Sequence, residues 1–329
     1  MKVALALGAG GARGLAHLGV LKALEDLKIK FDFLIGASAG GLATALYAYY
    51  GTADNAIDAV KQILKSPKYK EIQLEDFSVE KDRGLLRKAV EAVRETFMVA
   101  KGLVNKSLLS SDLVDDILAD LLPDIAIEEL PIPTGYVATD LVSAKDVVIL
   151  GGNLRSAVKA TGAIPGIFPP VELGDMLLVD GGATQKVPVV AALALGADVV
   201  IGVDVGRPPI PMSRFRSALD ILIRIDNITA YRLNDLELAL SDVVISPSVA
   251  HIQWYEFERI EEAVNIGYAE AIRMRTRLRR VLFVKPAVFA LKKLVPIKDA
   301  RRHIMPIARK FFKFYPSESL WRLRSSKRS

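Results

Sequence analysis

Two glycine-rich turns constrain the fold of this chain more than any other feature. Residues 8–14 (GAGGARG) follow an apolar run at 2–7. Residues 36–40 (GASAG) follow a second apolar run at 31–35. Runs that are apolar at nearly every position are typical of strands buried on both faces of a parallel sheet. Since helix-forming residues come after each turn, the sequence predicts two strand–turn–helix units of an α/β domain.

The second turn has the G-x-S-x-G pattern of a nucleophile elbow. Gly36 and Gly40 flank Ser38 at a strand-to-helix turn, where residues without side chains permit the strained backbone that exposes a hydroxyl. At the start of the following helix, unpaired N–H groups and the helix dipole favour an alkoxide and the oxyanion that follows it. Two interpretations stay open: Ser38 is an exposed nucleophile, or it is only the N-cap of that helix.

The first turn matches neither of two common phosphate-binding patterns. A phosphate-binding loop needs Lys-Ser or Lys-Thr after its last glycine, and no such pair follows. A dinucleotide fingerprint needs a third glycine, where this chain has Arg13, and an acid at the end of the next strand, where it has Ser38. The turn is therefore interpreted as a nest of backbone N–H groups that holds a developing oxyanion, worth roughly 3 kcal/mol per donor in acyl transfer.

A serine nucleophile also needs a base, and a carboxylate is the better candidate here. None of the three histidines lies in a serine-triad pattern, and the first of them falls on the apolar arc of a helix: His17, His251 and His303. Asp180 ends a short apolar strand, and Gly181 and Gly182 after it permit close approach to another backbone turn. The alternative for this motif is an Asp-Gly hairpin turn.

Together these motifs resemble the patatin-like phospholipase family. Its hallmarks are a glycine-rich G-G-x-[RK]-G loop, a G-x-S-x-G elbow and a D-G-[GA] acid. They occur here in that order, at residues 10–14, 36–40 and 180–182. The stretch 163–170 (AIPGIFPP) is also typical of bacterial and archaeal members. The resemblance covers roughly residues 1–250.

The resemblance implies a serine hydrolase that cleaves acyl esters of phospholipids or related lipids through an acyl-enzyme intermediate. It makes Ser38 the nucleophile and Asp180 its only partner, a dyad without histidine. The amides of Gly10 and Gly11 bind the oxyanion, and Arg13 braces the loop or meets a lipid phosphate. The other motif residues support these turns: Gly14, Gly36, Gly40, Gly181 and Gly182. The alternative function is a membrane-binding module of the same fold with little turnover.

Alternating apolar runs and helical patterns predict a three-layer α/β/α domain over residues 1–272. Further strands are expected near 134–139, 146–150, 177–179, 199–203 and 243–245. Residues 66–125 are predicted to form a charged, helical insertion. Its apolar positions at 97–99 and 103–104 either line an acyl-chain groove or lid, or pack as ordinary helix contacts.

The C-terminal extension, residues 273–329, is strongly basic. It contains 18 Lys and Arg against 2 acidic residues, whereas residues 1–272 contain 26 against 36. One apolar helical face is predicted from Ile304, Ile307, Ala308, Phe311, Phe312 and Tyr315. We predict that residues 281–329 bind an anionic membrane surface. The alternatives are packing on the acidic domain, within one chain or across a homo-oligomer, and a solvated arm; no nucleic-acid partner is expected, because no named binding motif is present.

The chain has no cysteine, which excludes disulfides and thiol catalysis and suits a reducing compartment. We therefore expect a cytoplasmic protein, peripheral on the inner face of the membrane. No cofactor and no metal are expected, because no cluster of His and carboxylates has ligand spacing. No apolar run reaches the length of a membrane span, and a first strand leading directly into the glycine loop predicts no cleavable signal peptide.

Overall fold

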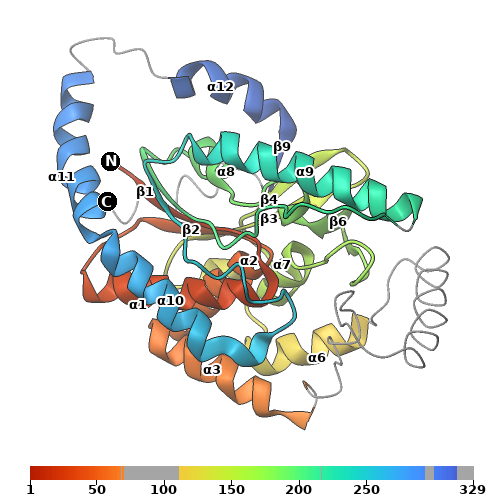
Figure 1. The fold of residues 1–329 in the computed structure, drawn as a ribbon. Coiled ribbons are helices and arrows are strands. Elements are labelled where there is room, and N and C mark those ends of the chain that lie inside the picture. Colours follow the sequence, from red (N-terminus) through yellow and green to blue (C-terminus); the bar gives the residue numbers. More distant parts are fainter. Residues whose placement is uncertain (68, 70–110, 216, 293–299, 317–329) are drawn as a thin grey trace.

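The computed structural model describes residues 1–67, 69, 111–215, 217–292 and 300–316. Its centre is one mixed sheet in the order β5-β6-β3-β2-β1-β7-β8, in which β4 also pairs with β3 and β9 pairs with β4 (Figure 1). Five strands run parallel: β3 (Thr134–Asp140), β2 (Phe33–Ala37), β1 (Val3–Leu7), β7 (Val199–Val203) and β8 (Val243–Ile245). The remaining strands are β6 (Met176–Asp180) and β4 (Lys145–Ile149), both antiparallel to β3, and β5 (Val171–Leu173) and β9 (Phe312–Tyr315).

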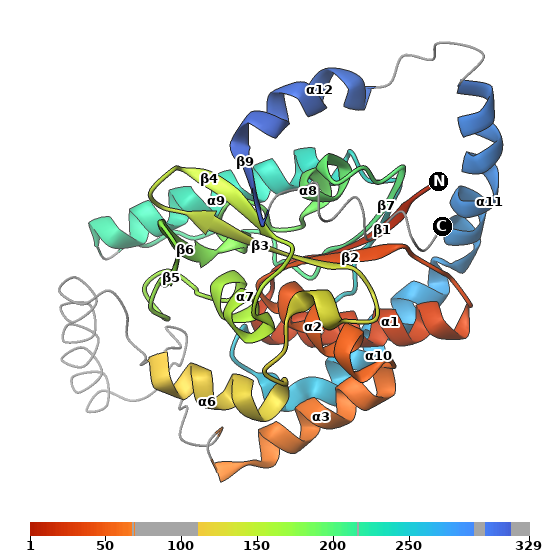
Figure 2. The same ribbon diagram turned by 180° about the vertical axis from the view of Figure 1, so that it is seen from behind.

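Helices cover both faces of the sheet, which confirms the predicted three-layer arrangement (Figures 1 and 2). One layer contains α1 (Ala16–Asp26), α2 (Ala39–Tyr50), α3 (Ala53–Lys65), α6 (Ser111–Leu121), α7 (Leu154–Thr161) and α10 (Ile260–Arg273). The other contains α8 (Val189–Ala194), α9 (Ala218–Leu238) and α12 (Ala300–Ala308). Alternate side chains of β1 enter the two cores: Leu5 and Leu7 belong to one cluster, and Ala4 and Ala6 to the other.

The register on β3 positions the candidate site. β2 pairs in parallel with the first half of β3, ending at Ala37 opposite Val137. β6 pairs antiparallel with the second half, ending at Asp180 opposite Ala138. The carboxyl ends of β2 and β6 therefore meet at neighbouring positions of one strand. Residues that are far apart in sequence are brought together by backbone pairing alone.

The described end of the basic extension packs on the domain. From α10 the chain continues into α11 (Arg275–Lys292), and Arg301 of α12 forms an ion pair with Asp242, just before β8. After a short 3-10 turn (η6, Arg309–Phe311), β9 pairs in parallel with β4. Residues 300–316 therefore pack on the domain, which is one of the alternatives that the sequence left open for the extension. The membrane contact of residues 281–329 stays a prediction.

The predicted apolar helix face over 304–315 is wrong at its carboxyl end, because residues 312–315 form β9. Phe312 and Phe314 stack with ring centroids 6.2 Å apart, and Phe312 is buried in the second core cluster. Their spacing of two fits a strand, and the available edge of β4 supplies the partner. Local periodicity contains no information about that partner.

Of the predicted insertion, the structure describes α6, which packs on α3 and α7. The apolar positions at 97–99 and 103–104 lie outside the described residues. Among the helices of the described ranges, none combines the length and the apolar content needed to cross a bilayer.

Candidate active site

Ser38 occupies a strained turn between β2 and α2. Its φ of 55° and ψ of −127° are unusual for a residue with a side chain, and such strain costs on the order of 1–3 kcal/mol. The flanking glycines make the turn possible. A Cβ on Gly36 would lie 2.3 Å from the carbonyl oxygen of Gly40, and one on Gly40 would lie 2.1 Å from that of Leu7. Ser38 is the N-cap residue of α2, but its side chain makes no capping hydrogen bond, so capping does not account for this serine.

The Ser38 hydroxyl instead donates a hydrogen bond to Asp180, with 2.6 Å between Oγ and Oδ2. Both side chains are buried, at 6% and 5% exposure. The other carboxylate oxygen of Asp180 accepts from the amide of Gly182 at 2.7 Å. A Cβ on Gly181 would lie 2.2 Å from the carbonyl oxygen of Val137, which explains the glycine next to the acid. A 3-10 turn follows Asp180, so the alternative of a hairpin turn is wrong.

Burial makes Asp180 a stronger base than an ordinary aspartate. Its pKa is raised from 3.8 to about 6, mainly because the carboxylate is removed from water. The hydrogen bonds from Ser38 and Gly182 and the charge of Lys186 act in the opposite direction and lower the pKa. The carboxylate is therefore ionised near neutral pH, yet basic enough to accept a proton from an attacking alcohol.

The first glycine turn lies directly against the elbow. A Cβ on Gly14 would lie 2.4 Å from the Cβ of Ala39, the residue after Ser38. Most amides of the turn have acceptors: Gly8 donates to Val203, Ala9 to Lys186 and Ala12 to Trp254. Among the described residues, the amides of Gly10 and Gly11 have none. These two amides are therefore available to an oxyanion.

Arg13 braces this turn through backbone carbonyls. Its Nε donates to the carbonyl of Val205 at 3.2 Å, and its Nη1 donates to that of Ile252 at 3.1 Å. Burial lowers the pKa of Arg13 to about 10, so the guanidinium stays charged at neutral pH. This geometry agrees with the first of the two roles expected from the sequence, a brace rather than a contact to lipid phosphate.

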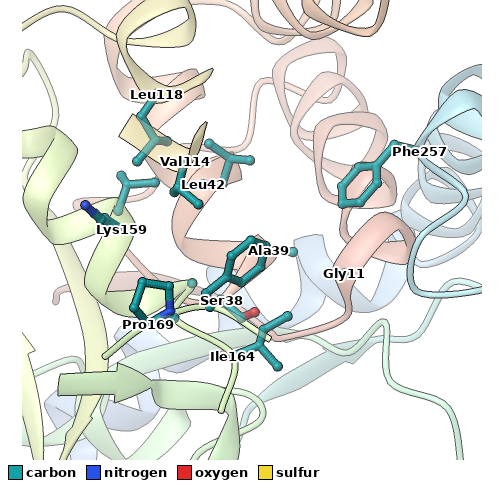
Figure 3. A pocket seen from close by; sticks show the side chains of 14 residues that line it. Gly11, Ser38, Ala39, Leu42, Val114, Leu118, Lys159, Ile164, Pro169 and Phe257 are labelled. Atoms are coloured by element: carbon teal, nitrogen blue, oxygen red, sulfur yellow. The ribbon is translucent and has the colours of Figure 1, made fainter. Parts of the chain in front are cut away.

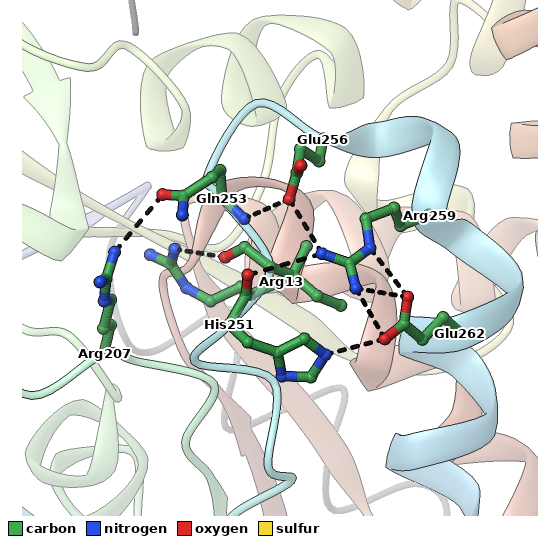
Figure 4. A network of polar contacts seen from close by, with 8 residues as sticks. Arg13, Arg207, His251, Gln253, Glu256, Arg259 and Glu262 are labelled. Carbon is green, nitrogen blue, oxygen red and sulfur yellow. Dashed lines mark hydrogen bonds and ion pairs between the residues drawn. The ribbon is translucent and has the colours of Figure 1, made fainter. Parts of the chain in front are cut away.

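A polar network holds the loop that contacts the glycine turn (Figure 4). Arg259 binds Glu256 at 3.1 Å and Glu262 at 2.7 Å, and Glu256 accepts from the amide of Gln253 at 2.7 Å. Next to Gln253, the carbonyl of Trp254 accepts from Ala12 at 2.7 Å. The ion pairs thus fix the backbone against which the glycine turn is built.

His17 and His251 take no part in the contact between Ser38 and Asp180. His17 is fully buried and its Nε2 donates to the carbonyl of Gly8 at 2.7 Å. Burial lowers its pKa to about 4, so the ring is neutral and is a hydrogen-bonded part of the core, in agreement with its place on an apolar helix arc. His251 pairs with Glu262 in the network of Figure 4. The side chain of His303 lies outside the described residues.

Sequence reasoning missed Thr161, at the end of α7. The Ser38 amide donates to the Thr161 carbonyl at 3.1 Å and to its hydroxyl at 3.0 Å. The same hydroxyl donates to the carbonyl of Val137 on β3. The elbow is therefore tied to the sheet, and its own serine amide is engaged. No local motif indicates this, since Thr161 lies 123 positions from Ser38.

A second missed group supports the acid. Thr184 and Gln185 follow the Asp180 turn, and both bind Asp146 of β4; the Gln185 Nε2 is 2.8 Å from the carboxylate. Thr184 also lies 2.7 Å from the hydroxyl of Thr139 on β3. These contacts fasten the turn after the acid to two strands. Their partners come from the sheet register, which the sequence alone does not reveal.

An apolar pocket opens at Ser38 (Figure 3). It has a volume of about 720 Å³ including its open mouth, and Gly11 lies on its wall. Apolar side chains form most of the lining, among them Leu42, Val114, Leu118, Ile164, Phe168 and Phe257. Among the lining residues that the structure describes, Lys159 is the one cation, and its ammonium is held by Asp115 at 2.6 Å. The pocket offers an apolar chain a surface that ends at the serine.

Comparison with known proteins gives a family match. A model of the family described as patatin-like phospholipase matches residues 5–193. An uncharacterized NTE family protein of Mycobacterium tuberculosis is 32% identical over 202 residues, which cover 61% of this chain and 48% of that protein. Patatin-like phospholipase domain-containing protein 6 of Mus musculus is 30% identical over 207 residues, 62% of this chain and 13% of that protein. The chain spans about half the length of the mycobacterial relatives it matches.

Two solved structures also align. VipD from Legionella pneumophila gives a TM-score of 0.43 at 13% identity, covering 84% of this chain and 66% of that one. A chain of the ExoU–SpcU complex from the type III secretion system of Pseudomonas aeruginosa gives 0.38 at 14% identity, covering 85% and 52%.

Proposed function

The chain belongs to the patatin-like phospholipase family, and from this premise we propose that it is a serine acyl hydrolase of lipids. The observation that supports the proposal most is the 2.6 Å hydrogen bond from a strained Ser38 to a buried Asp180. Nucleophile and base within hydrogen-bond reach are the minimum requirement for acyl transfer through a covalent intermediate. The apolar pocket that ends at Ser38 fits the acyl chain of a lipid ester.

In the proposed reaction, Ser38 Oγ attacks the ester carbonyl carbon while its proton moves to Asp180 Oδ2. The carbonyl oxygen becomes an oxyanion, and the free amides of Gly10 and Gly11 donate to it. The tetrahedral intermediate collapses with cleavage of the ester C–O bond, and the leaving alcohol takes the proton from Asp180. Water then attacks the acyl-enzyme, gives its proton to Asp180 and releases the fatty acid, and the proton returns to Ser38.

The test is release of free fatty acid from phospholipids, lysophospholipids and short p-nitrophenyl esters. We expect Ser38→Ala and Asp180→Ala to lose activity on every substrate that the wild type cleaves. Ser248→Ala is a matched control, because Ser248 is exposed and outside the site. A fluorophosphonate probe should label the wild type and Ser248→Ala but not Ser38→Ala. Without labelling of the wild type, the membrane-binding module with little turnover becomes the better account.

A further inference from the structure

The beginning of α9 exposes an apolar surface with no partner among the described residues. Four side chains in its first half are 46% to 64% exposed: Ile221, Leu222, Ile223 and Ile225. The loop before the helix adds three more, at 45% to 51%: Ile210, Met212 and Phe215. Exposed apolar groups that are contiguous in this way mark interaction surfaces, whereas single ones need no explanation. We name these seven residues the α9 tip.

The α9 tip lies on the edge of the sheet at which Ser38 is found. The loop leaves the sheet after Val203, whose carbonyl accepts from Gly8 of the first glycine turn. Asn234, near the end of α9, donates to Asp204 just beyond the same strand end. The sixteen residues before Asn234 therefore extend about 24 Å past that point, at about 1.5 Å per residue. Figures 1 and 2 both show this end of α9 projecting beyond the strands.

The pattern of exposure favours a lipid surface over a protein partner. Ile221, Leu222 and Ile223 are consecutive, so they point in three directions separated by about 100° around the helix. A groove or a flat protein surface covers one side of a helix, whereas immersion in lipid covers all sides. Arg224 lies at the same helix end, where its guanidinium donates to the carbonyl of Ile210 at 2.7 Å and joins the helix to the loop. A cation in that place suits anionic lipid headgroups.

The start of α12, in the basic extension, lies at the opposite edge of the sheet. Arg301 pairs with Asp242 and donates to the carbonyl of Asp198, and these residues directly precede β8 and β7. A membrane held at the start of these strands would be distant from the pocket. We propose that the α9 tip inserts into a phospholipid bilayer surface and holds the Ser38 pocket against it. The purpose of this docking, access of lipid to Ser38, rests on the proposed function, whereas the docking itself requires no catalysis.

Site-specific labelling tests the insertion directly, because the chain has no native cysteine. Leu222→Cys and Leu236→Cys, each labelled with an environment-sensitive fluorophore, are mixed with phosphatidylcholine vesicles with and without phosphatidylserine. Leu236 is the matched control, since it is 71% exposed near the other end of the same helix. We expect a blue shift at position 222 alone, larger with phosphatidylserine. No shift at 222, or equal shifts at both positions, overturns the proposal, as does a concentration-dependent shift at 222 without vesicles, which indicates a second copy.

A charge variant separates docking from catalysis. The double variant Leu222→Asp/Ile223→Asp should bind vesicles at least about tenfold more weakly, while its hydrolysis of a soluble p-nitrophenyl ester stays at the wild-type rate. Leu236→Asp should change neither property. Equal vesicle binding by the double variant and the wild type overturns the docking proposal. If the wild type cleaves no ester, the proposed function fails, and vesicle binding still decides the role of the α9 tip.

Discussion

The pH dependence of ester hydrolysis tests the assignment of Asp180 as the base. The carboxylate must be ionised to accept the serine proton, and burial raises its pKa to about 6. Above that pH the base is available, and below it protonation removes the base. The rate constant kcat/KM should therefore reach a plateau above pH 7 and fall to about one half at pH 6 and about one tenth at pH 5. An aspartate at its ordinary pKa of 3.8 would retain nearly full activity at pH 5.

The assay is kcat/KM for a soluble p-nitrophenyl ester, followed at a wavelength where nitrophenol and nitrophenolate absorb equally. Circular dichroism over the same pH range checks that the chain stays folded. Lys186→Gln adds an internal check, because the ammonium of Lys186 lowers the pKa of Asp180. Its removal should move the midpoint to higher pH. Lys61→Gln, whose partner Glu261 lies on the surface, should leave the midpoint unchanged.

A plateau that continues down to pH 5 would refute the reasoning. It would mean that Asp180 is not the base, or that the carboxylate is hydrated in the active protein. A midpoint near 6 that does not respond to Lys186→Gln would assign the titration to another group. A midpoint near pH 6 and its shift to higher pH in Lys186→Gln are both needed to connect the pH profile to the burial of Asp180.

Three further variants test the site. Asp180→Asn should abolish hydrolysis but raise Tm. The folded-state pKa of Asp180 lies above its ordinary value of 3.8, so the ionised carboxylate costs roughly 3 kcal/mol of stability at pH 8, and this cost disappears as the pH falls below 4. An equal change in Tm at pH 8 and below pH 4 would contradict this. Gly11→Ala should lower kcat by about 10²-fold, because Gly11 has a φ of 57° and a Cβ there would lie 2.4 Å from the Trp254 carbonyl oxygen, which would displace the Gly11 amide. An unchanged kcat would exclude this amide as an oxyanion donor. Arg13→Lys should lower stability by about 1–3 kcal/mol in denaturant unfolding and affect phospholipids and neutral esters equally; a loss confined to phospholipids would favour a phosphate contact.

The local parts of the site were predictable because their requirements are local. Gly36, Gly40 and Gly181 are each required by a backbone atom less than 3 Å from where a Cβ would lie. Such steric demands leave a pattern in a few consecutive residues. The strands expected near 199–203 and 243–245 are confirmed as β7 and β8, since continuous apolar runs are also a local property.

The unpredicted parts depend on pairing between distant segments. β9 exists because β4 offers an edge, and Thr161 reaches Ser38 because α7 ends beside the elbow. The exposure of Leu222 is of the same kind. Leu222 lies on an apolar stretch of α9, and whether such a stretch is covered depends on where the end of the helix lies relative to the sheet. Periodicity gives the element and says nothing about its neighbours.

Two features of the site reduce stability, and the sheet holds both. Ser38 has a strained backbone, and Asp180 is an ionised carboxylate removed from water. Ser38 directly follows β2 and Asp180 is the last residue of β6, and both strands are paired with β3, at Val137 and Ala138. The backbone at neither residue can move far without disturbing strand pairing in the centre of the domain. The fold thus keeps a basic carboxylate next to a strained serine by backbone register, which is the geometry that the proposed dyad without histidine requires.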